Sequence, residues 1–260
     1  MPPQFHLMIF VLFVALPLTG RMAPAQEPPA GPATPVPADT PDAFGARVRA
    51  YLLAHPEVIV EAVQIYQQRQ QAAQAETVKG TIAERADEIF RDPAAPVSGN
   101  GRGDVTLVEF FDYNCKYCRA VAPTVDAVLG ADAGLRLVYK EFPILGAGSE
   151  AAARVALAAR RQGRYQELHE ALMRVEMPVT EAKALQAAAA VGLDLERLRR
   201  DMADPAIDRA IARNQALAAA LGINGTPGFV IGDQVVPGAV DRATLEGLVA
   251  QIRGEQVRAP

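Results

Sequence analysis

The chain has 260 residues, of which half are hydrophobic and 22% are charged. This length allows one large or two small domains with a substantial core. The formal net charge is −4, and no cluster of basic residues occurs along the chain. These properties argue against a nucleic-acid-binding surface, so we expect no nucleic-acid partner.

Residues 1–25 have the pattern of a secretory signal peptide. An uncharged apolar run at 7–18 is too short to span a bilayer comfortably, and Ala23-Pro24-Ala25 supplies an Ala-x-Ala cleavage pattern. We expect export to the periplasm with cleavage near Ala25; the alternative is an uncleaved membrane anchor. Residues 26–41 interleave Pro with Ala and Thr, a composition that predicts an extended, disordered linker.

Residues 42–91 are predicted to be helical. The apolar residues at the start share one helix face: Phe44, Val48, Tyr51 and Leu52. His55-Pro56 breaks this helix, because proline suits the first turn of a new one. The glutamine-rich stretch 67–74 is too polar to pack on a core. Two interpretations stay open: an arm through which copies of the chain form a homo-oligomer, or a simple helical cap on the following domain.

Two strands are predicted in the next part of the chain. Residues 92–104 form a loop by their Pro, Gly and Asn content. Residues 105–112 are β-branched, aromatic and mostly apolar, which is typical of a buried strand. Residues 119–129 have apolar groups at helical spacing, and a second apolar strand follows at 135–139.

The remaining elements complete an α/β pattern. A helical stretch rich in Ala, Leu and Arg occupies about 147–222 and is interrupted by two X–Pro pairs. Residues 228–231 and 234–236 predict a β-hairpin, and Asp241 can cap a last helix at 242–252. The order of the elements therefore predicts an α/β fold with a helical insertion.

The only two cysteines lie where the first strand turns into a helix, in the motif Cys115-Lys116-Tyr117-Cys118. The N–H groups and dipoles of a helix N-terminus stabilise a thiolate. Cys115 is then the exposed nucleophile, and Cys118, one turn deeper, resolves a mixed disulfide. The alternatives are a structural disulfide, which would close a very short loop, and half of a zinc site. Zinc usually takes four ligands, and the three histidines are distant in sequence. The pattern favours a redox-active pair and predicts no metal site.

The element order, with Cys-x-x-Cys after the first strand and Gly225-Thr226-Pro227 before the third, resembles the thioredoxin fold. The helical block before that proline is similar to the DsbA-like branch, and the resemblance covers residues 104–252. Its most specific pieces are residues 108–118 and 222–231. The helical N-terminus from Phe44 to Val58 resembles the exported ScsC/Com1-like subgroup, in some members of which this region drives oligomerisation.

Glu109 is the only charged residue inside this strand, before Asp112 at its end, and the strand is apolar on both faces. A carboxylate buried there is unfavourable unless it is partnered or neutral. The resemblance implies that this acidic residue, six positions before Cys115, lies beneath the site and helps to move the proton of Cys118. The alternative is a structural, salt-bridged glutamate. Lys140, at the end of the second strand, is the expected partner of Glu109 unless its side chain is simply solvated.

The resemblance also implies that Pro227 follows a cis peptide bond and lies opposite the cysteine pair. The backbone of Thr226 would then pair with an extended substrate, a mode of recognition that tolerates many sequences. Lys116-Tyr117 replaces the Pro-His of the most oxidising relatives, and Thr226 is more usual in isomerase-like ones. These two departures leave the direction of the reaction open.

We therefore expect an exported thiol–disulfide oxidoreductase, acting most readily as an oxidase, with no cofactor other than its own disulfide. Its expected partners are cysteine-containing or unfolded exported proteins and a membrane redox partner. One alternative is an oligomeric isomerase or reductase linked to copper tolerance, and another is a non-enzymatic Cu(I)-binding module. His169 is expected on a helix, as a surface or capped residue rather than as a ligand.

Overall fold

The computed structural model of the chain describes residues 41–258, which belong to two compact units. The first unit ends at Ile59 and the second begins at Val60. The expected signal peptide (1–25) lies outside the described residues. So does the expected linker (26–41), except for its last residue, at which the first helix begins.

The N-terminal segment is helical, as the sequence predicts. Helix α1 (Pro41–Ala54) and helix α2 (Glu57–Glu84) are separated at His55-Pro56, and the short α3 (Ala86–Phe90) follows. The glutamine-rich stretch 67–74 lies within α2 and is exposed. Many large apolar side chains are also exposed between residues 41 and 73: Phe44, Val48, Tyr51, Leu53, Ile59, Val60, Val63, Ile65 and Tyr66.

A five-stranded mixed sheet forms the centre of the second unit, with the strand order β1-β3-β2-β4-β5. The strands are β1 (Val97–Gly99), β2 (Val105–Phe111), β3 (Leu135–Glu141), β4 (Gly228–Ile231) and β5 (Gln234–Pro237). Only the β2–β3 pair is parallel; the other pairs are antiparallel. The prediction of a continuous loop over 92–104 was wrong, because β1 pairs there with the edge of β3. Strand β1 has only three residues, Val-Ser-Gly, and so short a segment shows no alternation of apolar and polar residues from which a strand could be predicted.

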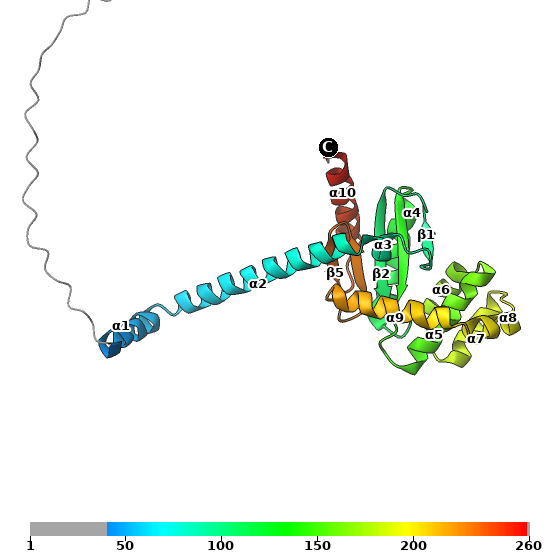
Figure 1. Cartoon of the computed structure of the whole chain (residues 1–260), viewed down its shortest axis with the longest axis horizontal. Helices are drawn as coiled ribbons and strands as arrows, with labels where there is room; N and C mark the ends of the chain where they lie inside the picture. The colour runs from blue at the N-terminus through cyan, green and yellow to red at the C-terminus, as the bar shows by residue number, and fades with distance from the viewer. Residues whose placement is uncertain (1–40, 259–260) are drawn as a thin grey trace, which may run out of the picture. The chain divides into compact units, whose positions relative to one another are not determined.

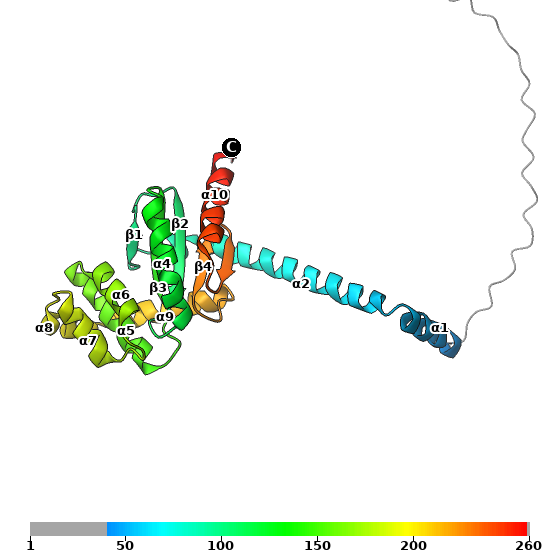
Figure 2. The same cartoon turned by 180° about the vertical axis from the view of Figure 1, so that it is seen from behind.

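Alternate residues of β2 and β3 face two separate apolar clusters. Leu107 and Leu137 face the cluster that contains residues of α4 (Lys116–Ala131) and α10 (Arg242–Arg258). Val108 and Val138 face the other cluster, which contains residues of α3 and α9 (Pro205–Ala220). Figure 1 and Figure 2 show the sheet from these two sides, with α4 in front of it in Figure 2. Helix α10 continues six residues beyond the predicted end at 252.

The helical block between β3 and β4 corresponds to the predicted insertion at about 147–222. It contains α5 (Ala147–Ala159), a 3-10 turn (Arg160–Gln162), α6 (Tyr165–Arg174), α7 (Glu181–Ala190), α8 (Leu195–Met202) and α9. Helices α5–α8 gather at one end of the sheet (Figure 1). Among residues 41–258, no helix has the length and apolar character needed to cross a membrane.

Candidate active site

Cys115 and Cys118 lie at the N-terminus of α4, directly after the turn that follows β2. Cys115 is the N-cap residue, in an extended conformation, and its Sγ accepts a hydrogen bond from the N–H of Cys118 at 3.4 Å. Cys115 is 5% exposed and Cys118 is fully buried. The two sulfurs are free thiols. The geometry therefore makes Cys115 the accessible sulfur, with Cys118 directly beneath it.

The loop before β4 faces this pair. The Thr226–Pro227 peptide bond is cis, and the Cys115 thiol donates a hydrogen bond to the main-chain oxygen of Thr226 at 3.2 Å. The N–H of Gly238, just after β5, donates to the oxygen of Pro227 at 2.9 Å and ties this loop to the sheet edge. The structure thus brings together Thr226, Pro227 and the cysteine pair, as the family resemblance implied.

Glu109 lies in the middle of β2, on the same side of the sheet as Cys118. Its register partners are Tyr139 on β3 and Phe229 on β4. The side chain is buried, and its Oε1 atom has no hydrogen-bond partner among the described residues. Burial, followed by the carboxylate of Asp126, raises the pKa of Glu109 to about 8. At neutral pH Glu109 is therefore mostly protonated.

Burial also raises the pKa of the Cys118 thiol well above its ordinary value, and the nearby Cys115 and Glu109 raise it further. A buried thiolate at this position is thus unfavourable. The sulfur of Cys118 must gain a proton whenever it leaves a disulfide. Glu109, a protonated carboxyl on the same side of the sheet, is suited to exchange that proton.

The expected pairing of Lys140 with Glu109 was wrong. Lys140 is the register neighbour of Phe110, so its side chain leaves β3 on the face opposite Glu109. Its Nζ donates to the main-chain oxygen of Glu88 at 2.7 Å and to Asp92 Oδ2 at 3.1 Å. The alternative of a solvated lysine fails too, because the side chain is 1% exposed. Burial lowers the pKa of Lys140, while its ion pair with Asp92 opposes that change.

The two residues between the cysteines point away from the core. Tyr117 is 56% exposed, and the Nζ of Lys116 lies 4.8 Å from the centroid of the Tyr117 ring. The hydrogen bonds of the Cys115 sulfur go to main-chain groups of Thr226 and Cys118, and neither involves the side chain of Lys116 or Tyr117. Both side chains are therefore accessible from solvent.

Sequence analysis missed the residues that hold the turn before Cys115. Asp112 is buried, and its Oδ2 accepts hydrogen bonds from the N–H groups of Ile144 at 2.9 Å and Leu145 at 3.0 Å. The side-chain amide of Asn114 pairs with both main-chain groups of Val179, at 2.6 and 3.1 Å. A polar residue directly after an apolar strand was the available signal. These contacts fix two loops of the helical insertion beside Cys115.

Arg119, one turn after Cys115, fixes the same region from α4. Its Nε donates to the oxygen of Tyr113 at 2.9 Å, and its Nη2 donates to the oxygen of Leu172 at 2.9 Å. A third bond, from Nη1, reaches the oxygen of Val175. A guanidinium that meets the last carbonyls of α6 also complements the negative end of that helix. Arg119 therefore joins the active-site turn to the helical insertion.

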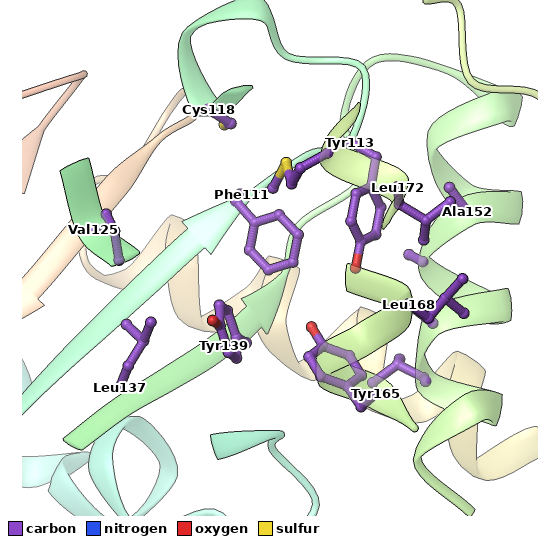
Figure 3. Packing of buried hydrophobic residues seen from close by; sticks show 14 of the residues in the cluster. Phe111, Tyr113, Cys118, Val125, Leu137, Tyr139, Ala152, Tyr165, Leu168 and Leu172 are labelled. Atoms are coloured by element: carbon purple, nitrogen blue, oxygen red, sulfur yellow. The ribbon is translucent and has the colours of Figure 1, made fainter. Parts of the chain in front are cut away.

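A buried polar cluster lies beneath this turn. The hydroxyls of Tyr113 and Tyr165 donate to Glu141 Oε1, at 3.1 and 2.8 Å, and Tyr113 Oη also lies 3.1 Å from His169 Nδ1. The hydroxyl ends of the two tyrosines point toward one another in Figure 3. Burial raises the pKa of Glu141 to about 8 and lowers the pKa of His169 to about 3. The expected surface position of His169 was wrong, because α6 packs it against Phe111 and Tyr139.

Within the described part of the chain, no group of three or more His, Cys, Asp or Glu side chains is placed to hold a metal ion. The chemistry on this surface is that of two thiols and the groups around them. A dithiol at a helix N-terminus, set against a cis-proline loop on a mixed sheet, defines a thioredoxin-fold thiol–disulfide oxidoreductase.

The chain belongs to the DsbA-like thioredoxin family. The DSBA-like thioredoxin domain matches residues 106–250, more than half of the chain. A second domain, described as the N-terminal domain of the copper resistance protein ScsC, matches residues 42–73. Both resemblances inferred from the sequence are thereby confirmed.

Solved structures agree with this assignment. A thioredoxin-like oxidoreductase from Silicibacter pomeroyi DSS-3 is 52% identical, covers 65% of this chain and 97% of its own, and superposes with a TM-score of 0.64. The thiol-disulfide exchange protein alpha-DsbA2 from Wolbachia pipientis is 28% identical, with coverage of 69% and 98% and a TM-score of 0.65. A periplasmic thioredoxin-like protein from Salmonella enterica serovar Typhimurium is 33% identical, with coverage of 65% and 95% and a TM-score of 0.59.

The curated relatives that match are described as Na(+)/H(+) antiporters. The protein from Salinispora tropica is 30% identical over 172 residues, which are 63% of this chain and 26% of that protein. The chain thus spans about a quarter of the length of the curated relatives that it matches. The likeness concerns that shared part, and antiport is not carried over to this chain.

Proposed function

We propose that the protein works in the periplasm and passes the Cys115–Cys118 disulfide to thiols of exported proteins, acting as an oxidase. The contact of Cys115 with the Cys118 N–H at the start of α4 is the observation that carries this direction. The unpaired N–H groups of a helix N-terminus favour the reduced form of the first cysteine, and a stabilised reduced form makes a disulfide oxidising. The signal-like residues 1–25 and the periplasmic relative from Salmonella support export.

The reaction proceeds by two thiol–disulfide exchanges. A substrate thiolate attacks Cys115 Sγ, the bond between the two cysteine sulfurs breaks, and Cys118 leaves with the electron pair and gains a proton. A second substrate thiolate then attacks the substrate sulfur of the mixed disulfide. The oxidised substrate is released, Cys115 leaves as the thiolate, and the protein remains as the dithiol. A membrane redox partner would restore the disulfide.

Substrate would dock on the surface around Cys115. The main-chain oxygen of Thr226, which the Cys115 thiol contacts, is suited to pair with an extended peptide. Four apolar side chains near this point are exposed: Tyr117, Ile144, Leu145 and Met177. Ile144 and Leu145 are held there through Asp112. An apolar rim of this kind suits unfolded proteins, whose apolar side chains are accessible.

A disulfide isomerase or reductase linked to copper tolerance is the second candidate. The match of residues 42–73 to the N-terminal domain of a copper resistance protein favours it. So do the exposed apolar side chains of α1 and α2, which suit association of several copies. Such an enzyme needs a reducing partner that keeps Cys115 free.

Two refolding assays separate the candidates. Reduced, unfolded ribonuclease measures oxidation, and ribonuclease with scrambled disulfides measures isomerisation. An oxidase forms disulfides in the first assay when it is supplied already oxidised. An isomerase restores activity in the second assay when it is supplied reduced. Faster recovery in the second assay than in the first would overturn the oxidising direction.

A further inference from the structure

A groove lies between helix α2 and strand β5, within the second unit. Its volume is about 910 Å³, which is at the upper end of the range of ligand pockets. Three glutamines of the polar stretch of α2 line one side of it, and β5 with the turn before it lines the other. The residues that matter below are Gln70, Gln71, Gln74, Val78, Val235 and Pro237. Nothing in the exchange reaction described so far uses this groove.

Three contacts hold α2 beside β5. Lys79 of α2 forms an ion pair of 2.8 Å with Asp233, in the turn between β4 and β5. Gln74 approaches Gly222, because a Cβ atom built on that glycine would lie 3.8 Å from Gln74 Nε2. Val78 of α2 and Val235 of β5 pack on the same apolar cluster. The groove is therefore part of the packed fold of this unit.

The groove continues to the active site. A second cavity, of about 170 Å³, lies beside the loop before β4 and is lined by Thr226, Pro227 and their neighbours. Val235 and Pro237 line both cavities, so the two form one path along β5. The main-chain oxygen of Thr226 is the group that the Cys115 thiol contacts. A polypeptide that reacts through its own cysteine with Cys115 can therefore follow this path away from the sulfur.

The surface of this path suits a polypeptide main chain of any sequence. Strand β5 is an edge of the sheet, since among the described residues it pairs with β4 alone. Its outer edge therefore offers main-chain groups to an added strand. On the side of α2, the glutamine side chains are exposed. A glutamine amide both donates and accepts hydrogen bonds without carrying a charge, so it can bond to either group of a peptide unit.

We propose that this groove binds the extended, unfolded part of a client protein that flanks the client's reacting cysteine. The client main chain adds to β5 as a further strand, and the glutamine amides bond to its remaining peptide groups. A second copy of the chain is the other possible occupant, but only a client has a cysteine that must start at the Thr226 end of the path. The inference rests on the proposed function, because it requires a client cysteine at Cys115.

Two alanines of α2 provide a test and its matched control. Ala75 lines the groove, whereas Ala73 does not and lies about 200° away around the helix. Both residues are exposed, so tryptophan can be introduced at either position. Ala75→Trp fills the groove, and Ala73→Trp adds the same side chain on another face of α2. Far-UV circular dichroism verifies that each variant is folded.

Kinetics measure the effect on a long client. The oxidised full-length protein is mixed with reduced, unfolded ribonuclease or with glutathione, which is too short to fill the groove. We expect the ratio of the ribonuclease rate constant to the glutathione rate constant to fall about tenfold in Ala75→Trp, as for the loss of one or two net hydrogen bonds. The ratio should be unchanged in Ala73→Trp.

Hydrogen exchange locates the bound segment. In full-length Cys118→Ala, a mixed disulfide at Cys115 holds either glutathione or an unfolded peptide whose single cysteine has uncharged flanks. The amides of β5 should exchange more slowly with the peptide attached than with glutathione attached. Strand β1, at the other edge of the sheet, is the internal control and should exchange equally in the two adducts.

Equal exchange of β5 in the two adducts, or an unchanged ratio of rate constants in Ala75→Trp, would overturn the inference. A lower mass of Ala75→Trp in light scattering, with its exchange with ribonuclease unaltered, would overturn it too, because a second copy would then occupy the groove. In each case the unaltered protein still exchanges disulfides. If Cys118→Ala captures neither glutathione nor the peptide, the proposed function itself is overturned.

Discussion

The thiol of Cys115 lies 3.2 Å from the main-chain oxygen of Thr226, although 111 positions separate the two residues. This contact joins the N-terminus of α4 to the loop before β4. It places the accessible sulfur beside a backbone group that is suited to pair with a peptide. A substrate strand held there would present its own sulfur to Cys115.

We expect Cys118→Ala to accumulate mixed disulfides between Cys115 and client proteins. Cys115 and Cys118 are the only cysteines of the chain, so in this variant no other thiol of the chain can displace a bound substrate. Non-reducing gel electrophoresis of periplasmic extracts, followed by mass spectrometry of the reduced adducts, measures this. Cys115→Ser is the control and should form none. Equal adduct formation by the two variants would contradict the assignment of Cys115 as the nucleophile.

Lys140→Met should destabilise the protein without altering disulfide exchange. The lysine is buried and paired with Asp92, and removing one partner of a buried ion pair costs about 3 kcal/mol of unfolding free energy. Because Lys140 and Glu109 leave the sheet on opposite faces, the dependence of the exchange rate on pH should not change. Urea unfolding followed by far-UV circular dichroism measures stability, since the chain has no tryptophan. A change in the pH profile as large as that of Glu109→Gln would show that Lys140 does act at the site.

Glu141→Gln should reduce the loss of stability at alkaline pH. Burial raises the pKa of Glu141 in the folded protein from 4.5 to about 8. A carboxyl with a raised pKa binds its proton more tightly in the folded protein than in the unfolded chain. Its contribution to the free energy of unfolding is therefore fully present below about pH 4.5 and is lost as the pH rises toward 8. Glutamine cannot ionise, and its oxygen can still accept both tyrosine hydroxyls. The pKa shift sets an upper limit of about 4 kcal/mol for the gain in unfolding free energy that we expect near pH 8.

The control for Glu141 is a comparison of unfolding at about pH 5 and about pH 8. Near pH 5 the two proteins should differ much less than near pH 8, because pH 5 is close to the ordinary pKa of 4.5, at which the loss of stability only begins. Glu109 has a pKa raised in the same direction, so part of the pH dependence should remain in the variant. A variant that loses stability more steeply with rising pH than the unaltered protein would contradict this account of Glu141.

The apolar side chains of α1 should promote association of several copies. Phe44 and Tyr51 are each 58% exposed, and exposed apolar surface of this kind is typical of interaction sites. We expect Phe44→Ser with Tyr51→Ser to lower the mass measured by light scattering toward that of one chain. Exchange with a small thiol peptide should be retained, because the cysteines are in the other unit. A single-chain mass for the unaltered protein would contradict association.

Much of the fold could be predicted from the sequence, because its main elements carry local patterns. The apolar residues of β2, the proline after α1 and the hairpin around Gly232 each indicate their own structure. Strand β1 has no such pattern: its three residues are extended because β3 offers a free edge to pair with. A pairing between segments about 40 residues apart leaves no local signal.

The same distinction applies to the site. Cys115, Cys118 and Glu109 could be predicted because a motif or a lone charge marks them. The face of the sheet on which the Lys140 side chain lies could not be predicted. It depends on the register of β3 against β2, and a shift of one residue would place the side chain on the opposite face. The burial of His169 depends on how α6 packs against the sheet. Tertiary packing decided each of these positions.

The reduction potential of the Cys115–Cys118 pair tests the central claim most directly. The protein is equilibrated with glutathione buffers of defined ratio, the free thiols are alkylated, and the reduced fraction is read from the mass shift. If the protein is an oxidase, the potential lies well above about −180 mV, since the helix N-terminus then stabilises the dithiol. A potential near −270 mV would contradict that direction and identify the pair as a reductant.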